Sequence, residues 1–334
     1  MTISKMAMKI GKLSNDELKK YILDNINLSR KEVINGAGIG ADTAVMDFEG
    51  NLVVASTDPI TATGKNIGSL AINIACNDIA CQGAEPIGVL ISALIPPSAD
   101  LEDLKVIIQD AQVQCKKLNV DIVGGHTEVT DVVKQIVLTT TALGKLNKDL
   151  KMDCSKINSS DIIAISKDIA IEGTSILYTE KRKELEDLLS LREKEELESY
   201  IDLLSVLPES KIAMKHGVKF MHDVTEGGIY GALVETAKFI GKNIEVEKDL
   251  IPIKTSSKKI VDYFKIDPYR LISSGSMIFI LAEENFKKFK RECCDNKIKI
   301  TKIGHIKDGE NLTIISDKVE TLKEVNRDEL YKAL

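Results

Sequence analysis

The chain has 334 residues, of which 43% are hydrophobic and 29% are charged, with 45 Lys and Arg against 51 Asp and Glu. This composition is typical of a globular protein, and the length favours two domains. The net charge of -6, the 4% aromatic content and the lack of Trp argue against a nucleic-acid-binding protein. The longest apolar run, at 87–95, is about half as long as a membrane-spanning helix, so we expect a cytoplasmic protein with no membrane partner.

In the first half of the chain, Ser14 and Glu17 form a capping-box signal for a helix, and the turn residues at 49–51 predict a β-hairpin. Hydrophobic periodicity predicts the other elements. The expected helices span 14–28, 66–82 and 101–118, and the expected strands span 44–48, 52–56, 87–95, 121–123 and 136–143. The strands at 52–56 and 136–143 are expected to be exposed sheet edges, which a homodimer would cover.

The second half continues the mixture of helices and strands after a polar stretch between Gly144 and Ser160. We therefore expect an N-terminal domain at 1–150 and a C-terminal domain at 151–334. The expected strands of the C-terminal domain lie at 162–166, 219–221, near 244, at 277–281 and at 298–306. Its expected helices lie at 185–204, 209–216, 228–240 and 284–293.

Six cysteines lie at positions 76, 81, 115, 154, 293 and 294. They have neither the paired spacing of a zinc site nor the density of a disulfide framework. We interpret them as buried thiols, and a redox or metal role stays open only for the adjacent Cys293 and Cys294.

The segment at 36–41 matches the glycine pattern of dinucleotide-binding proteins. That pattern requires a strand before the glycines and a helix after them, because the helix N-terminus binds the pyrophosphate. Here a helix is expected before the segment and a hairpin after it, which argues against a dinucleotide site. A P-loop is also lacking, because Gly64-Lys65 has no following Ser or Thr.

Polar residues interrupt the apolar pattern of the N-terminal half. Asp42 follows the glycine-rich turn, Asp58 ends an apolar strand, and the expected helix at 66–82 contains Asn73, Asn77 and Asp78. A buried carboxylate is costly unless it is paired or binds a cation, and oxygen ligands suit Mg²⁺ holding nucleotide phosphates. The alternative is that the two asparagines bind neighbouring backbone.

Two glycine-containing turns carry further candidates. Gly124, Gly125, His126 and Thr127 follow an expected strand, and the segment at 222–228 joins a strand to a helix. Such turns expose backbone N–H groups that favour phosphate. Single histidines are more often structural than functional.

Six motifs in order resemble one superfamily of ATP-dependent enzymes. They are GIGADTAV at 38–45, STDP at 56–59, AINIACNDIACQGAEP at 71–86, GGHTEV at 124–129, HDVTEGG at 222–228 and SSGSM at 273–277. The superfamily contains aminoimidazole ribonucleotide (AIR) synthetase, thiamine-monophosphate kinase, selenophosphate synthetase and the hydrogenase-maturation carbamoyl dehydratase. The chain is most similar to the last, HypE-like branch.

The resemblance implies a two-domain, PurM-like α+β fold with an N-terminal mixed sheet that dimerises and a C-terminal α/β domain. It implies ATP and Mg²⁺ as cofactors, bound between the N-terminal sheet of the dimer and the C-terminal domain. By the same resemblance, the metal ligands are Asp42, Asp58 and Asp78, the catalytic residues are Asp78, Asp223 and Lys12, and the nucleotide-binding residues are Asn73, Asn77, Gly124, Gly125, His126, Thr127, Gly227 and Gly228.

The chain departs from the family pattern in two places. The position of His126 is commonly an acidic metal ligand in the kinase and in the maturation enzyme. The maturation enzyme carries its substrate on a C-terminal cysteine, whereas no cysteine follows Cys294 here. We therefore expect a substrate that is separate and diffusible or is presented by another protein.

The expected function is transfer of the γ-phosphoryl group of ATP to an oxygen of a small substrate, or activation of that oxygen. The alternatives are a non-catalytic ATP-binding assembly protein and a small-molecule kinase of the thiamine-monophosphate type.

Overall fold

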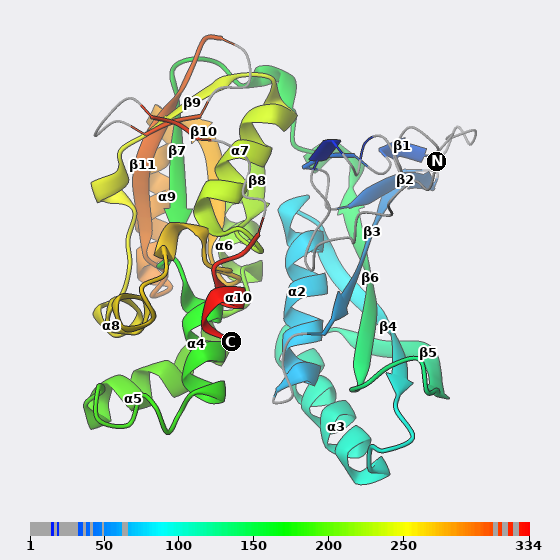
Figure 1. The fold of residues 1–334 in the computed structure, drawn as a ribbon. Helices are drawn as coiled ribbons and strands as arrows, with labels where there is room; N and C mark the ends of the chain where they lie inside the picture. Colours follow the sequence, from blue (N-terminus) through cyan, green and yellow to red (C-terminus); the bar gives the residue numbers. More distant parts are fainter. Residues whose placement is uncertain are drawn as a thin grey trace, which may run out of the picture.

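The structure is a computed structural model. It describes residues 33–35, 38–40, 43–48, 50–61, 66–309, 313–315, 320–322 and 327–334, together with residues 15, 16 and 19. Most of the predicted helix at 14–28, and the predicted site residues Lys12 and Asp42, lie outside this set. Two lobes lie side by side, each built on its own β-sheet (Figure 1). Within the described residues, no helix is both long enough and apolar enough to cross a membrane.

The first sheet has six strands in the order β1-β2-β3-β6-β4-β5. Its elements, in chain order, are β1 (Val33–Asn35), β2 (Ala44–Phe48), β3 (Asn51–Ile60), α2 (Ile67–Cys81), β4 (Glu85–Ile95), α3 (Leu101–Leu118), β5 (Asp121–Val129) and β6 (Val137–Asn147). The predicted hairpin and the helices α2 and α3 are confirmed. The strands β3 and β5 run further than predicted, because a paired strand accommodates polar residues on its exposed face.

The predicted sheet edges are wrong. The strand β3 pairs with β2 and β6, and β6 pairs with β3 and β4, so both are interior strands. The edges of the sheet are β1 and β5. The strand β5 pairs in parallel with β4, and all its residues except Ile122 are exposed. Strand order depends on pairing between distant segments, which local sequence patterns do not encode.

The helix α2 is buried on all sides. Every one of its residues except Ile74 is buried, including Asn73, Asn77 and Asp78. One side packs on the first sheet in a cluster that includes Val54, Leu138 and Ile72, whereas Ala80 and Cys81 pack with residues of the second lobe. A helix that is buried around its whole circumference lies in the interior of a large core, so its buried polar residues need hydrogen-bond partners.

The second sheet has seven strands in the order β13-β12-β9-β11-β7-β10-β8. Its strands are β7 (Asp161–Ser166), β8 (Phe220–Asp223), β9 (Asn243–Val246), β10 (Met277–Ala282), β11 (Ile300–Lys307), β12 (Thr313–Ile315) and β13 (Glu320–Thr321). Alternate residues of β7 face opposite sides: Ile163 packs in the cluster of α7 (Gly228–Ile240), and Ile162 packs in the cluster of α6 (Leu207–Lys215) and α9 (Glu283–Asp295). The central strands are therefore apolar on both faces.

The remaining helices were predicted less well. The expected helix at 185–204 is broken: α5 (Leu191–Glu198) starts at a capping box between Ser190 and Glu193, and a 3₁₀ turn follows it. The helices α4 (Ile171–Glu180), α8 (Thr255–Phe264) and α10 (Leu330–Ala333) were not predicted. The residue before α4 is Ala170, which has φ +63° and makes no side-chain cap, so the sequence carries no start signal there.

The interpretation of all six cysteines as buried thiols is partly wrong. Cys294 is exposed and Cys154 is half-buried, whereas Cys76, Cys81, Cys115 and Cys293 are buried. Both Cys293 and Cys294 lie on α9, and only Cys293 is on the face that packs against the second sheet.

Candidate functional site

Two of the predicted metal-binding carboxylates lie on either side of one hydroxyl group. Asp58 is on β3, and Asp78 is on α2, which covers that sheet. The hydroxyl of Ser56 donates a hydrogen bond to Oδ2 of Asp78, and its oxygen is 3.5 Å from Oδ2 of Asp58. Asp78 is 6% exposed. The structure therefore brings Asp58 and Asp78 together, and their role as metal ligands stays a prediction.

This donor set fits Mg²⁺. Within the described part of the chain, no three His, Cys, Asp or Glu side chains form a group that could hold a metal ion by themselves. Mg²⁺, however, is usually held by one or two carboxylates, with substrate phosphates and water completing its coordination. Asp58 and Asp78 supply two carboxylates and no softer ligand, which matches that preference.

The predicted amides have protein partners. Asn73 donates to the carbonyl of Ser69 at 3.0 Å and accepts from Nε2 of Gln114 on α3 at 2.8 Å. Asn77 donates to the carbonyl of Leu204 at 2.8 Å and accepts from the backbone N–H of Val206 at 2.9 Å. Among these bonds, the one from Asn73 to Ser69 is with neighbouring backbone, as the alternative interpretation proposed. The others link α2 to α3 and to the second lobe, and a direct contact of either amide with nucleotide stays a prediction.

The second lobe contributes Asp223 and the glycine turn that follows it. Asp223 is the last residue of β8, it is 1% exposed, and α7 begins at Gly228. Gly228 has φ +62°, and a Cβ atom there would lie 2.7 Å from the carbonyl oxygen of Tyr269. Only glycine fits this position without strain. The turn therefore holds the N-terminus of α7 against the segment at 269–271.

Cys81 connects the two lobes at this point. Its thiol donates to Oδ1 of Asp223 at 3.4 Å, and its sulfur accepts from the backbone N–H of Asp223 at 3.2 Å. Asp78 and Cys81 are three residues apart on α2, so they lie on neighbouring positions of one helix face. Cys81 therefore connects the helix that carries Asp78 to Asp223 at the end of β8.

Two buried carboxylates beside Asp223 were not predicted. Oε2 of Glu172, in the first turn of α4, accepts from the backbone N–H of Ser274 at 3.1 Å, and Oδ2 of Asp328 accepts from the backbone N–H of Gly227 at 2.7 Å. Burial raises the pKa of Glu172 to about 7, and the negative charges of Asp328 and Asp223 add to this effect. Burial also raises the pKa of Asp328 to about 6. An acidic residue inside the apolar run at 169–177 was the available signal for Glu172.

The predicted residues of the GGHT motif lie elsewhere on the first sheet. Gly124, Gly125, His126 and Thr127 are on the exposed edge strand β5. Asp58 is opposite Thr140, Thr140 is opposite Ile91, and Ile91 is opposite Gly125. Three inter-strand steps of about 4.8 Å therefore separate Asp58 from β5, or about 14 Å in all. Within one chain, the motif does not join the carboxylate pair.

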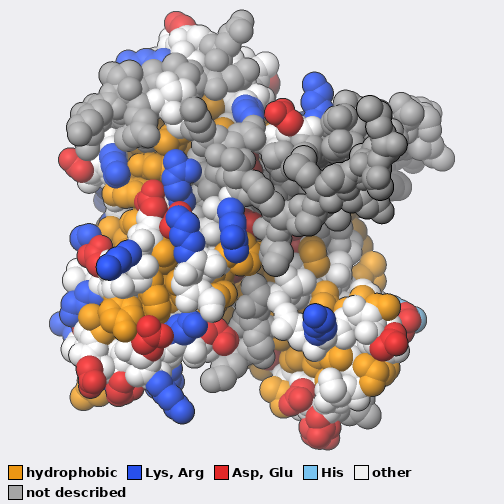
Figure 2. All heavy atoms as spheres, in the orientation of Figure 1, with side chains coloured by type: hydrophobic (Ala, Val, Ile, Leu, Met, Phe, Trp, Pro, Cys, Tyr) orange, Lys and Arg blue, Asp and Glu red, His pale blue; other side chains and the backbone are white. Residues whose placement is uncertain are grey.

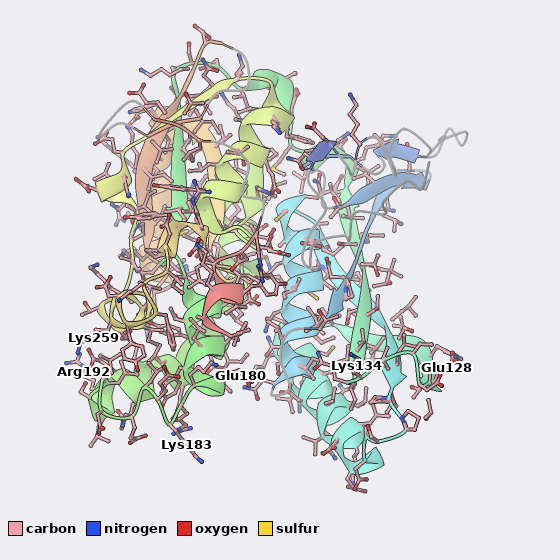
Figure 3. The ribbon with its side chains drawn as sticks, in the orientation of Figure 1. Glu128, Lys134, Glu180, Lys183, Arg192 and Lys259 are labelled. Carbon is pink, nitrogen blue, oxygen red and sulfur yellow. The ribbon has the colours of Figure 1, made fainter. Side chains whose placement is uncertain are left out.

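The surroundings of His126 fit this placement. Its Nε2 is 3.7 Å from Oε2 of Glu128, and both side chains are largely exposed. Figure 3 shows Glu128 at the outer edge of the first sheet, away from α2. Because β5 lies about 14 Å from Asp58, His126 is not placed to bind a metal held by Asp58 and Asp78 of the same chain.

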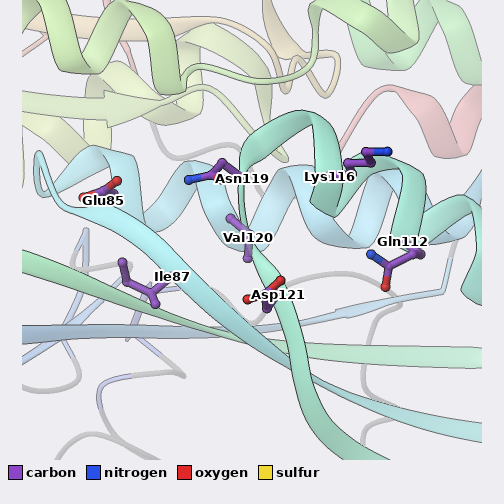
Figure 4. Close-up of a pocket in the computed structure, with 7 residues that line it drawn as sticks. All are labelled: Glu85, Ile87, Gln112, Lys116, Asn119, Val120 and Asp121. Carbon is purple, nitrogen blue, oxygen red and sulfur yellow. The ribbon is translucent and has the colours of Figure 1, made fainter.

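A polar pocket lies at another end of the first lobe (Figure 4). It has a volume of about 340 Å³ and lies where β4 and β5 begin and α3 ends. Its lining residues are Glu85, Ile87, Gln112, Lys116, Asn119, Val120 and Asp121. None of the predicted site residues is among them, so the pocket is separate from the carboxylates.

Comparison with known proteins places both halves of the chain in one family. The family model described as the N-terminal domain of AIR synthase related protein matches residues 40–146, and the model of the C-terminal domain matches residues 159–317. A putative hydrogenase expression/formation protein of Methanocaldococcus jannaschii is 27% identical over 297 residues, which cover 86% of this chain and 85% of that protein.

Two further similarities concern HypE proteins. The carbamoyl dehydratase HypE of Bradyrhizobium diazoefficiens is 27% identical over 252 residues, which cover 73% of this chain and 71% of that protein. The crystal structure of a HypE protein in complex with ATP has a TM-score of 0.71 and 19% identity, and the match covers 97% of each chain. The expected two-domain fold is thereby confirmed. Because both domain models match in order over most of its length, the chain belongs to the AIR synthase-related family, as its motifs indicated.

Proposed function

We propose that the protein is an ATP- and Mg²⁺-dependent enzyme that transfers the γ-phosphoryl group of ATP to an oxygen of a separate substrate, or activates that oxygen for elimination or ring closure. The observation that carries the proposal is the pair Asp58 and Asp78, which both lie at the hydroxyl of Ser56. Cys81, three residues after Asp78 on α2, is hydrogen-bonded to Asp223 of the second lobe. Similarity to a solved HypE protein that binds ATP supports the same choice of cofactor.

Each group of site residues would have a different role in the reaction. Asp58 and Asp78 would hold Mg²⁺, which neutralises phosphate charge when it is bound. The glycine turn at the start of α7 would place phosphate at the N-terminus of a helix, where the helix dipole favours an anion. Asp223, which the second lobe contributes, would accept the proton of a substrate hydroxyl or amide. Catalysis of this kind consists mainly of positioning and charge stabilisation.

We further propose that the protein acts as a homodimer through the edge of the first sheet. Parallel strand pairs are normally covered on both faces, but β4 and β5 expose Ile87, Leu90, Val123 and Val129 at 39–59% of their surface. Figure 2 shows hydrophobic side chains on the surface of this lobe. A second copy would cover this edge, and it would also bury the GGHT motif.

The proposal is tested by separating binding from turnover. Thermal stabilisation by ATP and Mg²⁺ reports binding, and phosphate release in the presence of candidate hydroxyl and amide acceptors reports transfer. Asp78→Asn should abolish both signals. Asp202→Asn, which removes an exposed carboxylate paired with Lys117 at 3.0 Å, is the matched control and should retain both. Binding without release with any acceptor would favour the non-catalytic assembly protein instead.

A further inference from the structure

Lys167 follows the last residue of β7 in a strained backbone conformation. Its φ is +54°, and Ala170, three residues later, has φ +63°. The left-handed region is disfavoured for residues with a Cβ atom, and such a conformation persists only where the surrounding contacts stabilise it. The side chain of Lys167 is 13% exposed, so it makes its contacts inside the protein. The interactions of its ammonium group supply that stabilisation.

The ammonium group of Lys167 joins three segments of the second lobe. Its Nζ donates to the carbonyl of Ser205 at 2.7 Å and to the carbonyl of Gly275 at 2.9 Å. It is also 2.6 Å from Oε1 of Glu209, which lies in the first turn of α6 and is fully buried. An ammonium group has three protons, and three acceptors surround it here. A Cβ atom at Gly275 would lie 2.8 Å from the carbonyl oxygen of Leu203, so the segments at 203–206 and 273–276 are in close contact.

The segment at 203–206 is bound to α2 of the first lobe. Asn77 of α2 donates to the carbonyl of Leu204 and accepts from the backbone N–H of Val206. Ser205, whose carbonyl binds Lys167, lies between these two residues. Asp78 follows Asn77 on the same helix. The ammonium group therefore holds the segment that binds α2 next to Asp78.

The segment at 273–276 is bound to the end of β8. The carbonyl of Ser276 accepts from the backbone N–H of Val224 at 2.9 Å. The next residue, Met277, begins β10 and lies directly opposite Asp223 in the sheet. By binding the carbonyl of Gly275, the ammonium group therefore also holds the segment that pairs with Asp223.

The link through Lys167 adds to the contact made by Cys81. Cys81 binds Asp223 directly, and Asn77 precedes Cys81 by four residues, or about one turn of α2. One contact alone would leave the helix free to pivot about it, whereas contacts on two successive turns also set the direction of the helix. That direction determines where Asp78 lies relative to Asp223.

We propose that Lys167 is a positioning residue of the candidate site: it holds the segment at 203–206 to the segment at 273–276 and thereby fixes Asp78 of the first lobe relative to Asp223 of the second. Glu209 balances the charge of its buried ammonium group. The proposal deepens the proposed function and rests on it for one point, that Asp78 and Asp223 serve the same reaction. The links between the segments do not depend on that function.

A second buried ion pair supplies a matched control. Nζ of Lys219 donates to the two carboxylate oxygens of Asp161 at 2.7 and 2.8 Å. Asp161 is fully buried and Lys219 is 17% exposed, which resembles the burial of Glu209 and Lys167. Asp161 begins β7, so this pair lies at the opposite end of the strand from Lys167. Its removal should destabilise the second lobe to a similar degree and leave the segments at 203–206 and 273–276 in place.

The test uses two double variants of the full-length protein. Lys167→Met with Glu209→Gln removes both charges, so no unpaired charge stays buried, and the carbonyls that Lys167 binds lose their donor. Lys219→Met with Asp161→Asn is the control. Lys167→Arg keeps a cation with several donors and should restore most of the wild-type behaviour. Should the first double variant fail to fold, Glu209→Gln alone should show the same changes to a smaller extent, and wild-type behaviour of that variant would overturn the proposal.

Hydrogen exchange without ligand measures the positioning. The N–H of Val206 binds Asn77 and the N–H of Val224 binds Ser276, so peptides that cover 204–207 and 222–225 report on the two links. We expect faster exchange in both peptides of the Lys167 double variant and wild-type exchange in the control. Unchanged exchange in both peptides, or equal acceleration by the two double variants, overturns the proposal.

Binding of MgATP, measured by isothermal titration calorimetry, tests the consequence for the site. We expect Kd to be about tenfold higher in the Lys167 double variant, because fewer molecules have the competent arrangement, and unchanged in the control. If the wild type and this variant bind MgATP equally well, the proposed function stands and the positioning role fails. If the wild type does not bind MgATP, the proposed function fails, and the exchange measurement alone decides whether Lys167 fixes α2 to β8.

Discussion

The thiol of Cys81 and the carboxylate of Asp223 are hydrogen-bonded across the boundary between the two lobes. Cys81 ends α2 of the first lobe, and Asp223 ends β8 of the second, and the backbone N–H of Asp223 also donates to the sulfur. This contact joins the helix that carries Asp78 to the strand that ends at Asp223.

Replacing Cys81 should loosen this contact. Cys81→Val removes the donor and the acceptor while keeping an apolar side chain of similar size, and the buried N–H of Asp223 loses a partner. We expect the free energy of unfolding to fall by about 1–2 kcal/mol. Cys81→Ser keeps a donor and an acceptor and should retain more stability than Cys81→Val. Urea denaturation of both variants measures the difference, and equal loss in the two would contradict the role of the hydrogen bonds.

ATP should stabilise the protein only when a divalent cation is present. At a hundredfold excess over Kd, binding adds about 2.7 kcal/mol. This corresponds to roughly 5–10 °C in Tm for a domain of this size range. Asp78→Asn keeps the size of the side chain and removes a metal-binding charge, so most of the shift should disappear. Differential scanning fluorimetry with and without a chelator measures it, and a shift of the same size in chelator would refute the metal assignment.

Stability should decrease as pH rises toward neutrality, because Glu172 is buried. Its pKa is about 7 in the folded protein and about 4.5 in an unfolded chain, so the folded state binds more protons between these values. The free energy of unfolding therefore falls across this window, by at most about 1.4 kcal/mol per pH unit from this group. Below pH 4.5 the full contribution is present, and above pH 7 it is lost.

Glu172→Gln tests this assignment. The amide oxygen can still accept from the backbone N–H of Ser274, and it carries no charge, so the variant should be less dependent on pH and more stable than the wild type at pH 8, by up to about 3 kcal/mol. Glu180→Gln, at the exposed end of the same helix, is the control. Parallel stability profiles of Glu172→Gln and the wild type between pH 4.5 and pH 8 would exclude Glu172 as the cause.

The homodimer should dissociate when a charge is placed on β5. Val123 is 58% exposed on this strand, and Val123→Lys would put an ammonium group into the proposed interface. We expect a dimer for the wild type and a monomer for the variant in sedimentation velocity experiments at micromolar concentration. Val106→Lys on α3, at 61% exposure, should leave the dimer intact. A monomeric wild type would exclude the interface altogether.

The sequence predicted those parts of the fold that local patterns determine. The hairpin β2–β3 was recognised from its turn residues, and α2 and α3 from their hydrophobic spacing. The edge strands were predicted wrongly, because strand order follows from long-range pairing. The helix α4 was missed because Ala170 provides no capping signal.

The candidate site was also predicted where local sequence patterns determine it and missed where long-range packing does. Asp58 and Asp78 were identified because carboxylates in apolar segments need a partner, and the structure brings both to Ser56. Glu172 and Asp328 were missed because they are distant in sequence and come close only through the packing of α4 and of the segment at 327–334. Asn77 was recognised as a polar residue in need of a partner, but its link to Leu204 and Val206 depends on how the lobes pack together.

The burial of α2 from both sides affects how the protein can be divided. Its outer surface is completed by the second lobe, where Ala80 and Cys81 share a cluster with Val206, Ile212 and Ala213. A fragment cut within residues 151–153, after β6, would sever no helix or strand, yet it would expose these apolar residues and the amide of Asn77 to water. Each half has its own sheet, but the apolar contacts between the halves stabilise both. We therefore expect the two halves to unfold in a single cooperative transition.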